Sequence, residues 1–162
     1  MMKSVYIETT IPSLATSRLS RDLIIAGRQA VTALFWEYER HKYELYVSQF
    51  VIDECSLGDI DAVKRRLEFI KGIPVIGNSE RIVLLANIYQ YLLGISEKAK
   101  TDCFHLAACV ISEIDYLLSW NCTHLGIYTY SRIKGYNESN NLFTPLLLTP
   151  EALIEISERR EE

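Results

Sequence analysis

Residues 98–125, KAKTDCFHLAACVISEIDYLLSWNCTHL, decide the fold of this chain. The segment starts with mixed polar residues and then becomes almost wholly apolar, which predicts a buried helix that begins near Glu97. Its apolar face is predicted to consist of Ala99, Cys103, Leu106, Ala107, Val110 and Ile114. Asp102 borders that face near the start of the helix, so we expect its carboxylate to be half-buried. The run YLLSW at 116–120 then predicts a buried strand that ends beside Asn121.

Strands and helices alternate along the rest of the chain as well. Short apolar runs predict strands at 4–7, 43–48, 73–77, 116–120 and 144–149. Helical spacing and end signals predict helices from Thr10 onward and at 21–41, 49–58, 59–72, 79–93 and 150–160. Parallel neighbouring strands need crossover connections, and they are buried on both faces. The sequence therefore predicts an α/β protein, a three-layer α/β/α sandwich around a central, mostly parallel five-stranded sheet.

Several residues set the expected ends and faces of these elements. Pro74 lacks an amide donor and fits an edge strand or the start of a strand. Gly94 is expected to close the helix at 79–93, and Pro150 to occupy the first position of the last helix. The polar segment YNESNN at 136–141 is expected to connect elements. The residues at helical spacing within 21–41 are Leu23, Ala26, Ala30, Leu34 and Tyr38.

Length and composition predict one domain over residues 1–162. The chain has 162 residues, of which 49% are hydrophobic and 23% charged, as in ordinary globular proteins. Glu8 interrupts the first apolar run too early for a signal peptide, and no later run approaches the roughly 20 residues of a membrane span. We therefore expect a cytoplasmic protein without a membrane segment. The net charge of −4 argues against bulk coating of nucleic acid but is compatible with a nuclease.

The cysteines are expected to be reduced. Cys55, Cys103, Cys109 and Cys122 have neither a CxxC pair nor the spacing of a secreted disulfide framework. Cys103 with His105 is echoed by Cys122 with His124, but two residues apart on a helix is a rotation of about 200°. Such pairs point to opposite faces, which disfavours a zinc site.

Polar residues follow the predicted strands where ligands bind in open parallel sheets, beyond the carboxyl ends of the strands. Glu8 follows the first strand and Asn121 the fourth. Asp102 reaches the same edge if its helix begins there. In the helix after the second strand, only one of the neighbours Asp53 and Glu54 can face this edge. Each of these positions also has a simpler interpretation, as a helix-dipole acid, a turn residue or an exposed side chain.

Converging carboxylates predict a metal site. Three of them within a few ångströms would repel one another unless a divalent cation neutralised their charge. Oxygen ligands favour Mg²⁺ or Mn²⁺, which can activate water and stabilise a leaving oxygen. Competing α/β chemistries lack their motifs, because the chain has no Asp-x-Asp after the first strand, no phosphate-binding glycine loop and no G-x-S-x-G elbow.

Four stretches carry a resemblance to PIN-domain proteins, close to the VapC-type toxins of bacterial toxin–antitoxin systems. They are VYIETTIPS, YVSQFVIDECSLGD, KTDCFHLAACVISEIDYLLSWNCTHL and, less specifically, LLLTPEAL. The resemblance implies a metal-dependent ribonuclease with Mg²⁺ or Mn²⁺ held by Glu8, Glu54 and Asp102, and with Asn121 as a further polar site residue. It also implies an RNA substrate, a cognate antitoxin protein and a homodimer.

The sequence leaves other functions open. Glu8 stands where the family usually has Asp, and Asn121 where it often has an acid, so a PIN-like module that binds RNA or a protein without cutting is the alternative. A third reading is a structure-selective DNA nuclease of related fold. Thr9, Thr10 and Ser48 are expected to orient ligands or waters. His105 and His124 are expected to be structural.

Overall fold

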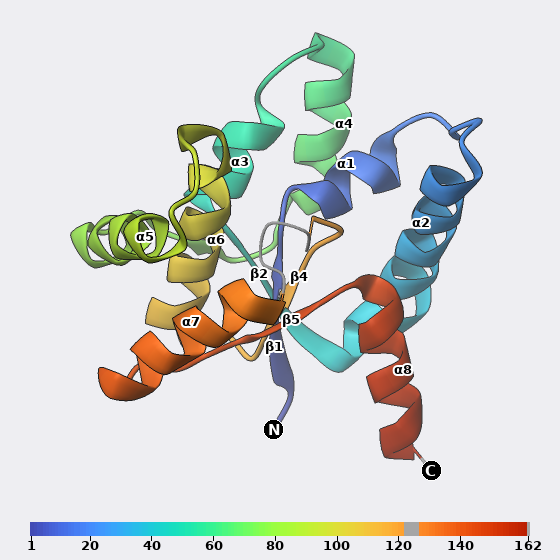
Figure 1. Ribbon diagram of the computed structural model, residues 1–162. Coiled ribbons are helices and arrows are strands. Elements are labelled where there is room, and N and C mark those ends of the chain that lie inside the picture. The colour runs from blue at the N-terminus through green and yellow to red at the C-terminus, as the bar shows by residue number, and fades with distance from the viewer. Residues whose placement is uncertain (122–126, 162) are drawn as a thin grey trace.

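The structure, a computed structural model that describes residues 1–121 and 127–161, has a parallel β-sheet at its centre (Figure 1). The described residues form a five-stranded sheet in the order β3-β2-β1-β4-β5. The strands are β1 (Lys3–Ile7), β2 (Tyr43–Ser48), β3 (Val75–Ile76), β4 (Tyr116–Leu118) and β5 (Leu146–Leu148). Val5 in the central strand is paired with Leu45 of β2 on one side and Tyr116 of β4 on the other. The predicted fold class is confirmed, with every strand pair parallel.

Helices cover both faces of this sheet (Figure 1). One layer contains α1 (Thr10–Thr16), α2 (Leu23–Leu34), α4 (Ile60–Ile70) and α8 (Pro150–Glu161). The other contains α5 (Glu80–Leu93), α6 (Lys100–Ile111) and α7 (Ile127–Ser139). Helix α3 (Gln49–Cys55) directly follows β2 and contacts both α4 and α6. Short turns of other helix types lie at Phe35–Glu39, Arg40–Lys42 and Glu97–Ala99.

Helix α6 is as deeply buried as the opening segment predicts. All six residues of its predicted apolar face are buried, and so are His105, Ala108 and Cys109. The helix therefore packs on more than one side, against α5 in its own layer and against β4 in the sheet. Asp102, in the first turn, is half-buried as expected.

The apolar residues at helical spacing within 21–41 do not form the side of the helix that faces the core. Leu23, Leu34 and Tyr38 are exposed, and the residues that face the core are Gln29, Thr32 and Phe35. The polar Gln29 can be buried because its side chain donates to Ser17 Oγ and to the carbonyl of Arg18, and accepts from the amide of Ser20. The apolar residues of α2 therefore lie mainly on its solvent-facing side, and its core-facing side includes the polar residues Gln29 and Thr32.

Helix α7 was not predicted, and it contains most of the segment expected as a connection. Asn137 is fully buried and accepts a hydrogen bond of 2.5 Å from the Tyr89 hydroxyl. Its side-chain nitrogen donates to the carbonyl of Phe143 and to Thr144 Oγ1. These bonds attach the helix to α5 and to the chain leading into β5, so tertiary contacts outweigh the turn-like composition.

The expected element ends agree with the structure. Gly94 follows α5 in the left-handed region, with φ of 58°, a conformation that glycine adopts without a steric penalty. Pro150 opens α8, and Pro74 precedes the edge strand β3, where its carbonyl accepts from the amide of Val47. Within the described part of the chain, none of the helices is long and apolar enough to cross a membrane.

Candidate functional site

A cavity lies at the carboxyl end of the central strands, the upper end of the sheet in Figure 1. Its volume is about 560 Å³, and all four predicted site residues, Glu8, Glu54, Asp102 and Asn121, line it. From β1 the chain builds one side of the sheet with β2 and β3. It then crosses back to add β4 and β5 on the other side of β1, so the order of connection reverses between β1 and β4. Such a switch point is where open α/β sheets bind ligands.

Glu8 is held at this point through one carboxylate oxygen. Its amide donates to the carbonyl of Leu118 at 3.1 Å, which continues the β1–β4 pairing by one residue. Its Oε2 accepts from the Thr10 amide at 3.0 Å, the Thr10 hydroxyl at 2.5 Å and the Ser119 hydroxyl at 2.8 Å. The residue is only 6% exposed. Among the described residues all of these bonds end on Oε2, so Oε1 is left for another ligand.

Glu54 is held in the same way from the last turn of α3. Its Oε1 accepts from the Thr9 hydroxyl at 2.7 Å and lies 2.5 Å from Nε2 of His105. Burial alone raises the pKa of Glu54, but the hydrogen bonds from His105 and Thr9 outweigh burial and hold this pKa below its usual value. Glu54 is thus kept as a carboxylate. Its neighbour Asp53 is exposed and bonds to Gln49, which decides the choice between the two acids.

His105 connects Glu54 to a buried chain of hydrogen bonds. Its Nδ1 lies 2.6 Å from the Tyr6 hydroxyl, which lies 2.6 Å from Ser48 Oγ. Ser48 Oγ accepts from the amide of Val51. Burial raises the pKa of Tyr6 well above its usual value, so the phenol stays protonated. Donors and acceptors match when Ser48 donates to Tyr6, Tyr6 donates to Nδ1, and Nε2–H donates to Glu54.

The tightest group of potential ligands differs from the predicted set. One ligand atom each from Glu8, Glu54 and His105 lie within 4.8 Å of one another. Asp102 lines the cavity but is not part of this compact group. His105 is 2% exposed and hydrogen-bonded on both ring nitrogens, as expected of a structural residue. It also belongs to the site, because one of these bonds is to Glu54. Its position three residues after Asp102, on the same side of a helix, is the sequence signal for its place in the site.

Asn121 and Ser119 come to the site together. The amide of Asn121 donates to Ser119 Oγ at 2.9 Å, and the same hydroxyl donates to Glu8. Ser119 and Trp120 were expected inside the strand, but β4 ends at Leu118, so both belong to the site edge. Thr9 and Thr10 orient the two glutamates directly, and Ser48 acts through Tyr6 and His105. Cys122 and His124 lie outside the described residues.

The three described cysteines take no part in the site. Cys55, Cys103 and Cys109 are free and buried, as expected. Burial raises the pKa of Cys55 to about 11 and that of Cys103 to about 12. These thiols remain protonated, and among the described residues no group of potential metal ligands includes a cysteine.

Comparison with known proteins supports the fold. The chain matches no protein-family model and no curated protein sequence. It is similar in structure to VapBC2 from Rickettsia felis bound to a DNA fragment from its promoter, with a TM-score of 0.52 and 11% sequence identity. The match covers 90% of this chain and 98% of that chain. The fold thus agrees with the PIN-like sandwich predicted from the sequence.

Proposed function

We propose that this protein is a metal-dependent endoribonuclease that hydrolyses RNA phosphodiesters, and that it is the toxin of a toxin–antitoxin pair. One observation carries the proposal. Glu8 and Glu54 come from different elements to the switch point of a parallel sheet, and each engages only one carboxylate oxygen with the described protein. Two anchored carboxylates with free oxygens form the kind of site that a divalent cation needs.

The residues fit Mg²⁺ or Mn²⁺. The carboxylates of Glu8 and Glu54 offer hard oxygen ligands, and Asp102 lines the same cavity. Both ring nitrogens of His105 are already hydrogen-bonded, so in this proposal the imidazole orients Glu54 and does not itself bind the cation. When bound, the cation supplies Lewis-acid chemistry, because it polarises phosphate oxygens and makes water a better nucleophile.

The chain's own residues have distinct tasks in this proposal. Glu8 and Glu54 bind the cation, and their hydroxyl and imidazole partners fix the direction of each carboxylate. Asp102, at the start of α6, supplies a third acid to the cavity, where it can accept a proton from water. Asn121 lines the same cavity, and its neutral side-chain amide can donate to a phosphate oxygen without adding negative charge.

The proposed partners follow from the fold and the family resemblance. The similar structure is a VapBC2 complex, which supports an antitoxin protein as the partner of this chain. A homodimer and a cytoplasmic location belong to the same proposal. Co-purification with the product of a neighbouring gene, followed by measurement of the mass of the complex, tests the partner and the number of copies together.

The deciding experiment is RNA cleavage by the purified protein with Mn²⁺ or Mg²⁺, alongside calorimetric titration of each metal. We expect saturable binding and cleavage that are both lost in Glu8→Gln and Glu54→Gln. Asp53→Asn is the matched control, since it removes an exposed acid next to Glu54. Cleavage that persists unchanged in both glutamine variants contradicts the proposal.

The non-cutting module remains the second candidate. Its support is that Asp102 stands outside the compact ligand group and that Asn121 is neutral. RNA binding without cleavage, in the presence of saturating Mn²⁺, selects this candidate. Competition between single-stranded RNA and structured DNA separates the ribonuclease from a DNA nuclease.

A further inference from the structure

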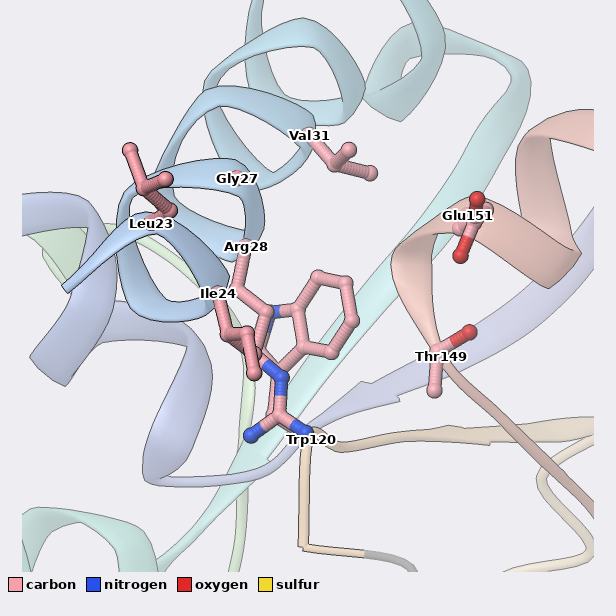
Figure 2. A pocket seen from close by; sticks show the side chains of 8 residues that line it. All are labelled: Leu23, Ile24, Gly27, Arg28, Val31, Trp120, Thr149 and Glu151. Carbon is pink, nitrogen blue, oxygen red and sulfur yellow. The ribbon is translucent and has the colours of Figure 1, made fainter.

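A second cavity adjoins the acidic one. It has a volume of about 630 Å³, within the range of about 300–1,000 Å³ that small-ligand sites occupy. Its lining comes from α2, from the segment after β4 and from the start of α8, and consists of Leu23, Ile24, Gly27, Arg28, Val31, Trp120, Thr149 and Glu151 (Figure 2). Arg28 and Trp120 line both cavities. A ligand can therefore extend from one cavity into the other past these two side chains.

Trp120 is fixed in position between the cavities. Its indole Nε1 donates to Thr32 Oγ1 at 2.8 Å, and its amide donates to Thr10 Oγ1 at 2.9 Å. The same Thr10 hydroxyl donates to Glu8. The indole ring therefore has a set location relative to the acidic site, and it is only partly covered by protein.

Arg28 brings a positive charge to the same place. Its side chain is exposed, and its Cζ lies 5.5 Å from the centre of the Trp120 ring. In the part of the chain that the structure describes, Arg28 forms no ion pair, whereas the acidic cavity beside it has several carboxylates. Figure 2 shows Arg28 reaching from α2 to the indole, with Thr149 and Glu151 on the other side.

We infer that this second cavity is a nucleoside subsite: the base of an unpaired nucleotide stacks on Trp120, and Arg28 contacts the phosphate between the two cavities. The inference rests on the proposed ribonuclease function. Proteins bind single-stranded nucleic acid by stacking bases on aromatic rings beside cationic groups, and arginine matches phosphate geometry. The carboxylate of Glu151 repels a phosphate from the α8 side, so the phosphate lies on the Arg28 side, toward the acidic residues.

A protein segment is the competing occupant. Leu23 is 88% exposed and Ile24 is 70% exposed, and both line this cavity. A protein partner would cover these two side chains, whereas a nucleoside needs only the indole and the guanidinium. The charge of Arg28, which forms no ion pair with the described residues, lies at the border of a carboxylate-lined cavity and favours the nucleoside, because it complements a phosphate group.

Quenching of Trp120 fluorescence by short single-stranded RNA, measured in EDTA, tests the subsite without any cleavage. The chain has two tryptophans, so Trp36→Phe leaves Trp120 as the sole tryptophan, which is excited selectively at wavelengths that tyrosine does not absorb. We expect saturable quenching by a five-nucleotide RNA, little quenching by an abasic strand of equal length, and affinity about tenfold weaker in Arg28→Gln. Arg81→Gln, an exposed arginine on α5 in the other helix layer, is the matched control and is expected to bind normally.

The outcomes separate the subsite from the function. Cleavage of RNA with Mn²⁺ but no change in Trp120 emission overturns the subsite and leaves the ribonuclease intact. Quenching that falls equally in Arg28→Gln and Arg81→Gln also overturns it, because it shows binding by overall charge. Quenching specific to Arg28 without cleavage supports the subsite and contradicts the ribonuclease.

Two further readouts keep the test decisive. If Trp36→Phe does not fold, the indole N–H signal of Trp120 in nuclear magnetic resonance spectra of the wild type reports the same stacking. A change in oligomeric state in the double variant Leu23→Ser and Ile24→Ser, together with no response to RNA, assigns the cavity to a second copy of the chain instead.

Discussion

Nε2 of His105 lies 2.5 Å from Oε1 of Glu54, although the two residues are 51 positions apart in the sequence. The imidazole holds the carboxylate from α6, and Tyr6 in the central strand holds the imidazole. The acid in α3 therefore takes its direction from a different helix and from the sheet. Residues that orient a metal ligand in this way typically change metal affinity by about 10- to 100-fold when they are replaced.

We predict that His105→Asn weakens Mn²⁺ binding by about 10- to 100-fold, because Glu54 loses its donor and its fixed direction. Calorimetric titration measures the change. Tyr6→Phe, which removes only the hydroxyl that bonds Nδ1, should have a smaller effect in the same direction. His41→Asn, at an exposed histidine, is the control. Equal affinity in His105→Asn and wild type rules out this role.

Thr10→Val should weaken metal binding and lower stability. The hydroxyl of Thr10 donates to Glu8 and accepts from the amide of Trp120, so valine leaves both groups without that partner. We expect a loss of about 1–3 kcal/mol in the free energy of unfolding, measured by urea denaturation. Thr16→Val, whose hydroxyl donates to the carbonyl of Pro12 within the same helix, is the matched control. A similar loss of unfolding free energy in both variants would show that the bond from Thr10 to Glu8 adds no stability beyond that of an ordinary hydroxyl bond within the helix.

Asp115 should make stability depend on acidic pH. Burial alone raises its pKa, but hydrogen bonds from the side chain of Lys3 and from the backbone and side chain of Ser4 outweigh burial and hold the pKa of Asp115 below its usual value. A carboxyl group with a lowered pKa in the folded state stabilises the protein fully above its unfolded pKa of about 3.9. That stabilisation is lost as pH falls from there through the folded pKa.

Asp115→Ala should therefore lower the free energy of unfolding by about 1–3 kcal/mol at pH 7 and by much less at the lowest pH where the protein folds. Urea denaturation across this pH range measures both. Asp61→Ala, at an exposed acid 4.0 Å from Lys64, should change stability little at either pH. A deficit in Asp115→Ala that does not shrink as pH falls would show that the carboxylate charge is not the cause.

The buried thiols should report on unfolding. Burial raises the pKa of Cys55 to about 11 and that of Cys103 to about 12, and it raises the pKa of Cys109 well above its usual value. In a Cys122→Ser variant at pH 8, we expect the remaining thiols to react with a disulfide reagent only at the rate at which the protein opens. Fast reaction in the native state, measured by absorbance, contradicts their burial.

The sequence predicted the sheet because its strands are short apolar runs that are buried on both faces. Val5, Val47 and Leu118 are at most 1% exposed, and such runs are recognisable without knowledge of their neighbours. Helix α7 was missed because the buried Asn137 is satisfied by tertiary contacts, among them a bond from Tyr89, 48 positions away, which composition does not indicate. The inner side of α2 was missed for the same reason, since Gln29 is satisfied by the preceding loop.

The sequence predicted where in the fold the site lies, but it did not predict the hydrogen bonds that hold the site residues in place. The rule that ligands bind beyond parallel strands predicted that Glu8 and Asn121 would lie together, and both line one cavity. The preference for Glu54 over Asp53 rested partly on the family resemblance. The ligand set of Glu8, Glu54 and Asp102 stays a prediction. The position of His105 three residues after Asp102 indicates the side of the helix on which it lies, but its bond to Glu54 depends on the distance between two helices, which no local pattern contains.

The hydrogen bond from Ser119 to Glu8 joins residues that are 111 positions apart, across the middle of the sheet. During synthesis, the N-terminal strand β1 leaves the ribosome long before β4 exists, so the bond from Ser119 to Glu8 cannot form until about three-quarters of the chain has been translated. Long-range parallel pairing is also slow to form. The contact that joins the first and fourth strands at the proposed site is therefore completed only late in synthesis, after most of the chain has been made.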